Sequence, residues 1–172
     1  MIELKEVSFS YNGSKRQTLS HMDFKIEEGE SVGIIGANGA GKSTILKLLV
    51  GLELNYQGSI MINHLKVEKK NLQEIRQKIG YVFQDSDSQL FMPTVYEDVA
   101  FAPRNYGFSK EQVDKRTTQA LKSIGIEELQ DRQIYRLSGG EKKLASIATV
   151  LSMEPDILIF DEPTIALDPR NR

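Results

Sequence analysis

The chain has 172 residues, of which 40% are hydrophobic and 27% charged, and its formal net charge at pH 7 is −2. Such values are typical of one globular domain, and the scattered basic residues argue against a nucleic-acid partner. The absence of cysteine excludes disulfides and thiolate metal sites and fits a reducing compartment. No signal peptide opens the chain and no apolar stretch reaches the roughly 20 residues that span a membrane, so we expect a soluble protein.

The first third of the chain has the pattern of strands followed by a loop and a helix. Alternating apolar residues at 2–9 and 22–26 predict two antiparallel strands joined across the turn-forming Asn12-Gly13. The short apolar run at 31–35 predicts a further strand, and a helix is predicted at 43–50 after a glycine-rich loop.

The middle of the chain changes from strands to helices. Further strands are predicted at 58–62 and 79–83, with a short amphipathic helix at 72–79 between them. From residue 94 to 133 the apolar spacing becomes helical, and Ser109 is in place to cap one of these helices. This region is the candidate helical subdomain.

The glycine-rich loop Gly-Ala-Asn-Gly-Ala-Gly-Lys-Ser at 36–43 fits the phosphate-binding pattern and stands between a predicted strand and a predicted helix. Glycines let backbone N–H groups approach phosphate oxygens at the helix N-terminus. Lys42 is expected to reach the β- and γ-phosphates of a nucleotide, and Ser43 to offer a hydroxyl to Mg²⁺. A dinucleotide-binding loop is excluded because its glycine spacing is absent. The predicted nucleotide-binding residues of this loop are Gly36, Asn38, Gly39, Ala40, Gly41, Lys42, Ser43 and Thr44.

Two carboxylates follow the apolar run at 157–160, which the sequence predicts as a buried strand of a parallel sheet packed against the apolar helix at 144–151. Ligand sites of α/β folds lie at the carboxyl ends of such strands. Asp161 is therefore expected to hold the hydrated Mg²⁺, and Glu162 to orient and activate the attacking water.

A second anion site is predicted where Leu-Ser-Gly-Gly-Glu precedes that apolar helix. Ser138 and Glu141 have the spacing of a capping box. Gly139 and Gly140 are not needed for the cap, and they leave the helix N-terminus open to a phosphate.

The phosphate loop, Leu-Ser-Gly-Gly-Glu and Ile-Leu-Ile-Phe-Asp-Glu-Pro-Thr, in that order, resemble ABC-type ATPases over nearly the whole chain. The resemblance implies that Tyr11 stacks on adenine and that Gln84 contacts Mg²⁺ and the attacking water. It implies that Asp168 belongs to a loop that communicates between two ATP sites. It also implies a second ATPase subunit, identical or different. Ser138 and Gly140 of this chain would complete the ATP site that is held by the phosphate loop of that second subunit.

Residues 84–101 look most like the ATPases of energy-coupling-factor vitamin importers and their cobalt and nickel relatives. This resemblance implies integral membrane transport subunits as partners and a cytoplasmic chain, peripheral on the inner face of the membrane. Leu90, Phe91 and Phe101 either contact the membrane subunit or pack the helical subdomain, and the sequence leaves both open.

The expected fold is α/β: the parallel-sheet core of a P-loop NTPase, with an N-terminal antiparallel β subdomain and an inserted helical subdomain. The expected division is 1–84 with 141–172 as the nucleotide-binding core and 85–140 as the helical subdomain. ABC-type ATPases continue past Asp168 with a further strand and a switch histidine, so we expect the C-terminal part of the domain to be missing here. We therefore expect this chain to hydrolyse ATP more slowly than the complete subunit. Two other functions stay open, a non-transport ABC ATPase and a nucleotide-binding module without turnover, although the former typically carries insertions that residues 84–138 lack.

Overall fold

The computed structural model describes residues 1–13 and 16–162 and comprises two compact units, Met1–Arg76 and Gln77–Arg172. Asp168 lies outside the described residues. Each unit has its own packed interior and is described separately.

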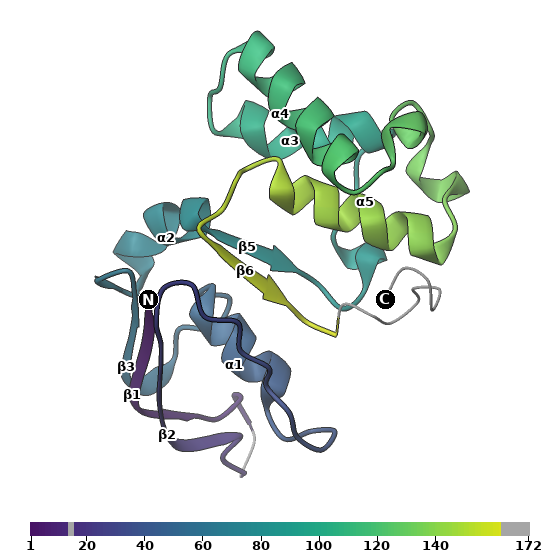
Figure 1. Ribbon diagram of the computed structural model, residues 1–172. Helices are drawn as coiled ribbons and strands as arrows, with labels where there is room; N and C mark the ends of the chain where they lie inside the picture. Colours follow the sequence, from purple (N-terminus) through teal and green to yellow (C-terminus); the bar gives the residue numbers. More distant parts are fainter. Residues whose placement is uncertain (14–15, 163–172) are drawn as a thin grey trace. The chain divides into compact units, whose positions relative to one another are not determined.

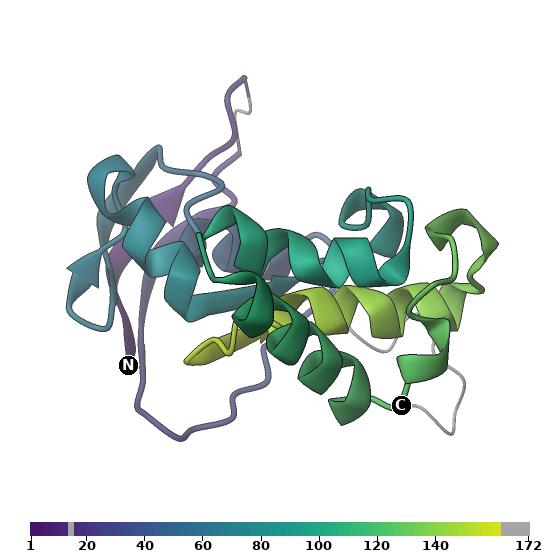
Figure 2. The same ribbon diagram turned by 90° about the horizontal axis from the view of Figure 1, so that it is seen from above.

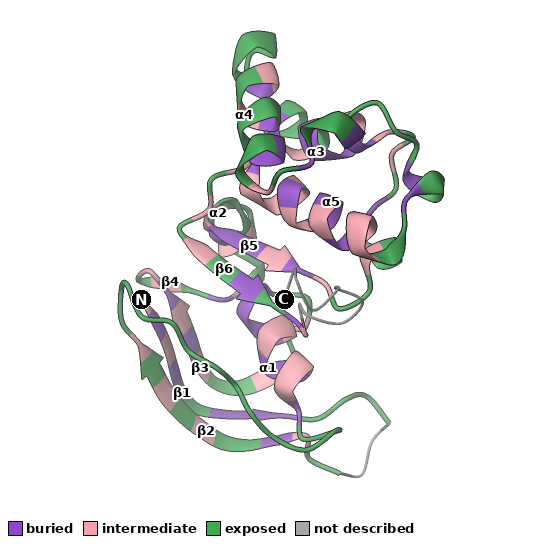
Figure 3. Ribbon diagram, turned by 45° about the vertical axis from the view of Figure 1, so that its right-hand side comes forward, coloured by how far each residue is buried: buried purple, intermediate pink, exposed green. Residues whose placement is uncertain are grey.

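The first unit is built on a four-stranded antiparallel sheet with strand order β2-β1-β3-β4 (Figure 1). The prediction of an opening antiparallel sheet is confirmed, as is the strand predicted at 58–62, which is part of β3. Burial in Figure 3 follows the pairing, since the central strand β1 is largely buried and the edge strand β2 is largely exposed. The strands are β1 (Ile2–Phe9), β2 (Leu19–Ile26), β3 (Tyr56–Ile62) and β4 (Leu65–Lys66).

The first unit also contains α1 (Lys42–Leu49) and most of α2 (Leu72–Lys78), which follows the short 3-10 helix η1 (Lys69–Asn71). Both α-helices were predicted. Arg76 donates to the carbonyl oxygens of Val50 at 3.2 Å and Gly51 at 2.9 Å. Carbonyls at a helix C-terminus have no intrahelical partner, so these two bonds satisfy the end of α1 and tie α2 to it.

The prediction of a strand at 31–35 is wrong. The segment forms no strand, and Val32 and Ile35 are 57% and 97% exposed. An apolar run becomes a strand only when a neighbour supplies ladder hydrogen bonds. The four-stranded sheet of the first unit does not include this segment, so the prediction failed because it rested on composition alone.

The second unit combines two parallel strands with three helices. Strands β5 (Ile79–Val82) and β6 (Ile157–Phe160) pair in parallel, with Val82 opposite Phe160. In Figure 1, α5 packs against β5, and α3 and α4 lie on the other side of α5. The helices are α3 (Val95–Asn105), α4 (Lys110–Ser123) and α5 (Gly139–Leu151), with the short 3-10 helices η2 (Ser86–Ser88), η3 (Glu127–Leu129) and η4 (Ile134–Arg136).

The three helices enclose an apolar core. Seen from above in Figure 2, α3 and α5 run side by side, and Figure 3 shows their buried sides turned toward each other. Ser109 caps α4 in a capping box with Gln112, so the predicted helix start is confirmed. Core residues shared by these elements include Leu90, Val95, Val99, Leu121, Leu137, Ala145 and Ala148.

The strand predicted at 157–160 is confirmed, but its complete burial is wrong. A Cβ on Gly80 would stand 2.2 Å from Val150, so α5 lies directly over β5 on the face that Gly80 shares with Val82. The residues paired with these two in β6, Leu158 and Phe160, stay 43% and 39% exposed. Helix α5 therefore packs over β5 but does not bury the same face of β6.

The predicted division, with residues 1–84 and 141–172 as the nucleotide-binding core and residues 85–140 as the helical subdomain, stays a prediction. Among the described residues, no helix is both long and apolar enough to cross a membrane.

Candidate functional site

The predicted phosphate loop ends where α1 begins. Gly41 precedes the helix with a φ of 92°, and a Cβ there would stand 2.8 Å from Leu19 Cδ2 and 3.2 Å from the Thr18 carbonyl oxygen. Only glycine adopts this left-handed conformation readily, and the close approach of Leu19 and Thr18 also disfavours any residue with a side chain at this position. The loop is thereby held against the start of β2, with the N–H groups of α1 opening toward it.

The Lys42 ammonium group folds back over this loop. Its Nζ donates to the carbonyl oxygens of Gly36 at 2.9 Å and Ala37 at 3.1 Å. Residues 36–40 are exposed, while Ser43 and Thr44 in the first turn of α1 are half-buried and buried. The exposed loop, the ammonium and the helix N-terminus together present positive charge and N–H donors at one place, which suits a polyphosphate.

Tyr11, expected to contact adenine, lies beside the same helix. Its hydroxyl is 3.1 Å from Thr44 Oγ1, and its ring meets the Phe9 ring edge to face at 4.8 Å. Tyr11 is 38% exposed. The structure therefore places Tyr11 beside the helix that follows the phosphate loop, and its side chain remains partly exposed and accessible to a stacking base.

The predicted catalytic residues of the second unit lie together at the carboxyl ends of β5 and β6. The side-chain amide of Gln84 donates to Glu162 Oε2 at 2.7 Å. The hydroxyl of Tyr81 donates to Asp161 Oδ2 at 3.1 Å. Asp161 is buried and its backbone N–H donates to the Val82 carbonyl oxygen at 3.1 Å, which continues the strand pairing by one step.

Glu162 departs from the strand in a left-handed conformation, with a φ of 50°. This conformation is uncommon for a residue with a side chain and is concentrated at turns and functional sites. The turn directs the Glu162 carboxylate toward Gln84, while Asp161 stays within the fold.

Lys143 of α5 is a residue of this site that sequence reasoning missed. It is 1% exposed, and its Nζ donates to the carbonyl oxygens of Phe83 at 2.7 Å and Gln84 at 3.2 Å. Burial lowers the pKa of Lys143, and the negative charge of Asp161 opposes that shift. Helical spacing could have found it, because Lys143 stands three residues before the buried Ser146 on the same side of α5.

The start of α5 is built as predicted. The Ser138 hydroxyl accepts from the Glu141 N–H at 3.3 Å, and the Glu141 carboxylate accepts from the Ser138 N–H at 2.7 Å. These bonds hold the pKa of Glu141 below its usual range. Ser138 and Gly139 are exposed and Gly140 is half-buried, so the helix N-terminus faces outward.

The residues left open as membrane-subunit contacts divide into two groups. Leu90 is 6% exposed and packs in the helical core, so its packing interpretation is confirmed. Phe91 and Phe101 are 64% and 40% exposed, and their rings meet edge to face at 4.8 Å. They form an exposed aromatic pair on the second unit.

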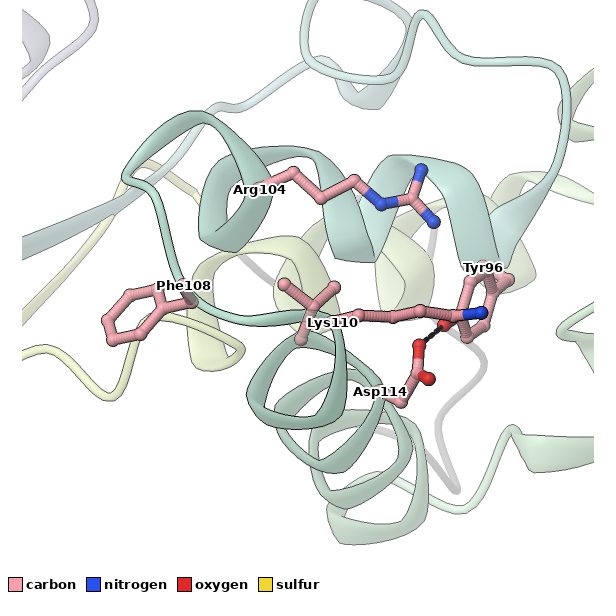
Figure 4. A pocket seen from close by; sticks show the side chains of 6 residues that line it. Tyr96, Arg104, Phe108, Lys110 and Asp114 are labelled. Atoms are coloured by element: carbon pink, nitrogen blue, oxygen red, sulfur yellow. Dashed lines mark hydrogen bonds between the residues drawn. The ribbon is translucent and has the colours of Figure 1, made fainter.

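A pocket of about 710 Å³ lies between α3 and α4, and none of the predicted site residues lines it. In Figure 4, Arg104 and Lys110 extend from the two helices toward Tyr96, whose hydroxyl donates to Asp114. Its lining residues are Tyr96, Arg104, Phe108, Lys110, Val113 and Asp114.

The predicted Mg²⁺ ligands are Ser43, Gln84 and Asp161. A hydroxyl, an amide oxygen and a carboxylate are the oxygen donors that this ion prefers, so their chemistry fits. Asp161 and Gln84 leave the ends of paired strands, and Ser43 belongs to the first unit.

Comparisons with known proteins agree with these features. Residues 19–165 match the protein family described as ABC transporter. The chain is 46% identical over its whole length to a putative ABC transporter ATP-binding protein of Geobacter sulfurreducens, and spans 69% of that protein. It is 46% identical to the energy-coupling factor transporter ATP-binding protein EcfA2 of Methanospirillum hungatei, over 98% of this chain and 43% of that protein.

Solved structures show the same likeness. CbiO1 from Clostridium perfringens, described as part of the ABC transporter complex CbiONQ, superimposes with a TM-score of 0.87 at 39% identity. That match covers 99% of this chain and 68% of the CbiO1 chain. A dimeric ATP-binding cassette in a post-hydrolysis state with ADP and Pi superimposes with a TM-score of 0.89 at 32% identity, covering 99% and 78%. The family match and these identities show that the chain belongs to the ATP-binding subunits of ABC transporters.

Proposed function

We propose that this chain binds MgATP and hydrolyses it to drive import of a vitamin or metal ion through membrane subunits of the energy-coupling-factor type. The observation that carries the proposal is the phosphate loop, where the Lys42 ammonium group lies over the loop carbonyls at the start of α1. On binding, this ammonium exchanges the Gly36 and Ala37 carbonyl oxygens for phosphate oxygens. Tyr11 then supports the adenine ring.

The hydrolytic step is assigned to the carboxyl ends of β5 and β6. Glu162 orients and deprotonates the attacking water, and the side-chain amide of Gln84 fixes the orientation of its carboxylate across 2.7 Å. Mg²⁺ supplies charge compensation for the phosphates, and Ser43, Gln84 and Asp161 are the residues that would hold it. Lys42 stabilises the negative charge that develops on the transferred phosphoryl group.

The working form in this proposal is a pair of ATPase subunits. The exposed N-terminus of α5 carries Ser138, Gly139 and Gly140, and its orphan N–H groups suit the γ-phosphate held by the opposite subunit. Dimeric cassettes among the structural relatives support this arrangement.

The membrane partner is proposed to dock at the exposed aromatic pair Phe91 and Phe101, which places the chain at the inner face of the membrane. Two adjacent exposed phenylalanines are unusual on a surface that stays in water, and aromatic residues are enriched in interfaces. The similarity to EcfA2 and CbiO1, both described as transporter components, supports an importer.

Calorimetric titration with MgATP tests the proposal. Wild-type protein is expected to bind, and Lys42→Ala to lose detectable binding because the phosphate charge loses its main counter-charge. Lys47→Ala, which removes a lysine from the last turn of the same helix, is the matched control and is expected to bind normally. Equal affinity in the Lys42 variant and wild type would refute the assignment, and phosphate release measured alongside reports hydrolysis.

A further inference from the structure

The segment that leaves β5 is fastened to α5 by side chains that no sequence motif predicted. Gln89 accepts from the Phe83 N–H at 3.1 Å and donates to the Ser146 carbonyl oxygen at 2.7 Å and to Thr149 Oγ1 at 2.8 Å. It therefore links the end of β5 to the middle of α5.

Lys143 makes the second and more buried link. Lys143 is 1% exposed, and its ammonium group donates to the carbonyl oxygens of Phe83 and Gln84 at 2.7 and 3.2 Å. A charge removed from water destabilises the fold unless hydrogen bonds and opposite charge replace the lost hydration. Two backbone carbonyls and the nearby Asp161 carboxylate supply that replacement.

The two carbonyls belong to the peptide groups on either side of the Gln84 Cα. Holding both oxygens on one ammonium group restricts the φ and ψ angles of Gln84, and these angles set the direction in which its side chain leaves the backbone. That side chain reaches Glu162 with a 2.7 Å hydrogen bond. A rigid backbone at Gln84 is thus the condition for a fixed Gln84–Glu162 contact.

We propose that Lys143 is a positioning residue that holds Gln84 against Glu162 and ties this pair to the helix that begins after Ser138. The inference rests on the proposed function, in which Gln84 and Glu162 serve ATP hydrolysis. In this proposal Lys143 acts on the backbone of Gln84 and not on the nucleotide or the metal ion. Its effect on turnover passes entirely through Gln84.

A double-mutant cycle separates this role from general stabilisation. Lys143→Met removes the ammonium and keeps a chain of similar length, and Gln84→Ala removes the group that it positions. Misplacing a catalytic group by about 1 Å lowers rates by roughly 10²-fold, so we expect Lys143→Met to lower kcat by about 10- to 100-fold with KM for MgATP unchanged. In the Gln84→Ala background the same substitution is expected to have no further effect.

The matched control is Lys142→Met. Lys142 is the neighbouring lysine of α5, and its ammonium group forms a 2.6 Å ion pair with Asp87, whose side chain is largely exposed. Exposed ion pairs contribute little, so kcat is expected to stay within about twofold of wild type. Thermal unfolding is recorded for every variant.

The possible outcomes distinguish a failure of the proposed role of Lys143 from a failure of the proposed ATPase function. If wild-type protein neither binds nor hydrolyses MgATP, the proposed function fails, and the role of Lys143 fails with it. If wild type turns over but the losses from Lys143→Met and Gln84→Ala multiply, or Lys143→Met keeps the wild-type kcat, only the inference is overturned. If Lys143→Met does not fold, Lys143→Gln carries the same cycle, since its shorter amide keeps a donor for one carbonyl, and multiplying losses overturn the inference there too.

Discussion

Gln84 and Glu162 are 78 positions apart in the chain, yet Gln84 Nε2 and Glu162 Oε2 are joined by a 2.7 Å hydrogen bond. The parallel pairing of Val82 with Phe160 explains this contact, because each of the two residues lies two positions beyond its strand's last paired residue. The register of β5 and β6 therefore sets the geometry of the proposed hydrolytic site.

Glu162→Gln is expected to stop hydrolysis and leave MgATP binding intact. The substitution removes the general base, whose contribution to rate is typically 10²- to 10⁴-fold, and preserves the size of the side chain. Phosphate release and calorimetric affinity are measured on the same preparation. Hydrolysis at the wild-type rate would show that Glu162 is not the base.

Tyr11→Ala is expected to weaken ATP binding, and Tyr11→Phe to preserve it. Stacking of a base on an aromatic ring contributes about 1–3 kcal/mol, which corresponds to a loss of roughly 5- to 150-fold in affinity. The Phe variant keeps the ring and loses only the contact of the Tyr11 hydroxyl with Thr44. Tripolyphosphate, which has no base, is the control ligand, and its affinity is expected to be the same for wild type and both variants.

Local signals in the sequence predicted local structure well. Ser109 and Ser138 mark the starts of α4 and α5 because a hydroxyl cap and its partner three residues later act within one turn. The loop at 36–43 was predicted for the same reason, since a phosphate-binding turn is specified by consecutive residues.

Features that depend on distant neighbours were predicted less well. The run at 31–35 has a strand's composition, but pairing is decided by another part of the chain. The buried Lys143 was missed because a lysine in a helix is ordinarily exposed, and the two carbonyls that hold it belong to residues 60 and 59 positions earlier in the chain.

Ser138→Arg is expected to leave ATP affinity of dilute monomer unchanged and to block ATP-driven pairing of subunits. Ser138 is exposed at the outward N-terminus of α5, and the proposed contact is with the nucleotide of the opposite subunit. Calorimetry at low protein concentration and size-exclusion chromatography with ATP measure the two properties. A parallel loss of affinity in the monomer would assign Ser138 to its own subunit's site.

Asp98 provides a test of the helical core. It is 3% exposed, and its Oδ2 accepts from the N–H groups of Phe91 at 2.9 Å and Met92 at 2.8 Å. Asp98→Ala leaves both donors without this acceptor, which is expected to lower the free energy of unfolding by about 1–3 kcal/mol for each N–H group left unsatisfied. Asp98→Asn keeps one carbonyl oxygen in place and is expected to be markedly less destabilising.

The comparison of wild type with Asp98→Asn should also depend on pH. Burial raises the pKa of Asp98 in the folded state, against the opposing effect of its hydrogen bonds to Met92 and Phe91. A carboxyl group whose pKa is higher folded than unfolded takes up a proton more readily in the folded state. Its unfavourable contribution is therefore full above the folded pKa, decreases as pH falls through it, and is gone below the unfolded pKa. Urea unfolding at pH 7 and near pH 4 should thus show wild type gaining stability relative to the Asn variant at the lower pH, and a constant difference would mean that the folded and unfolded pKa values are equal.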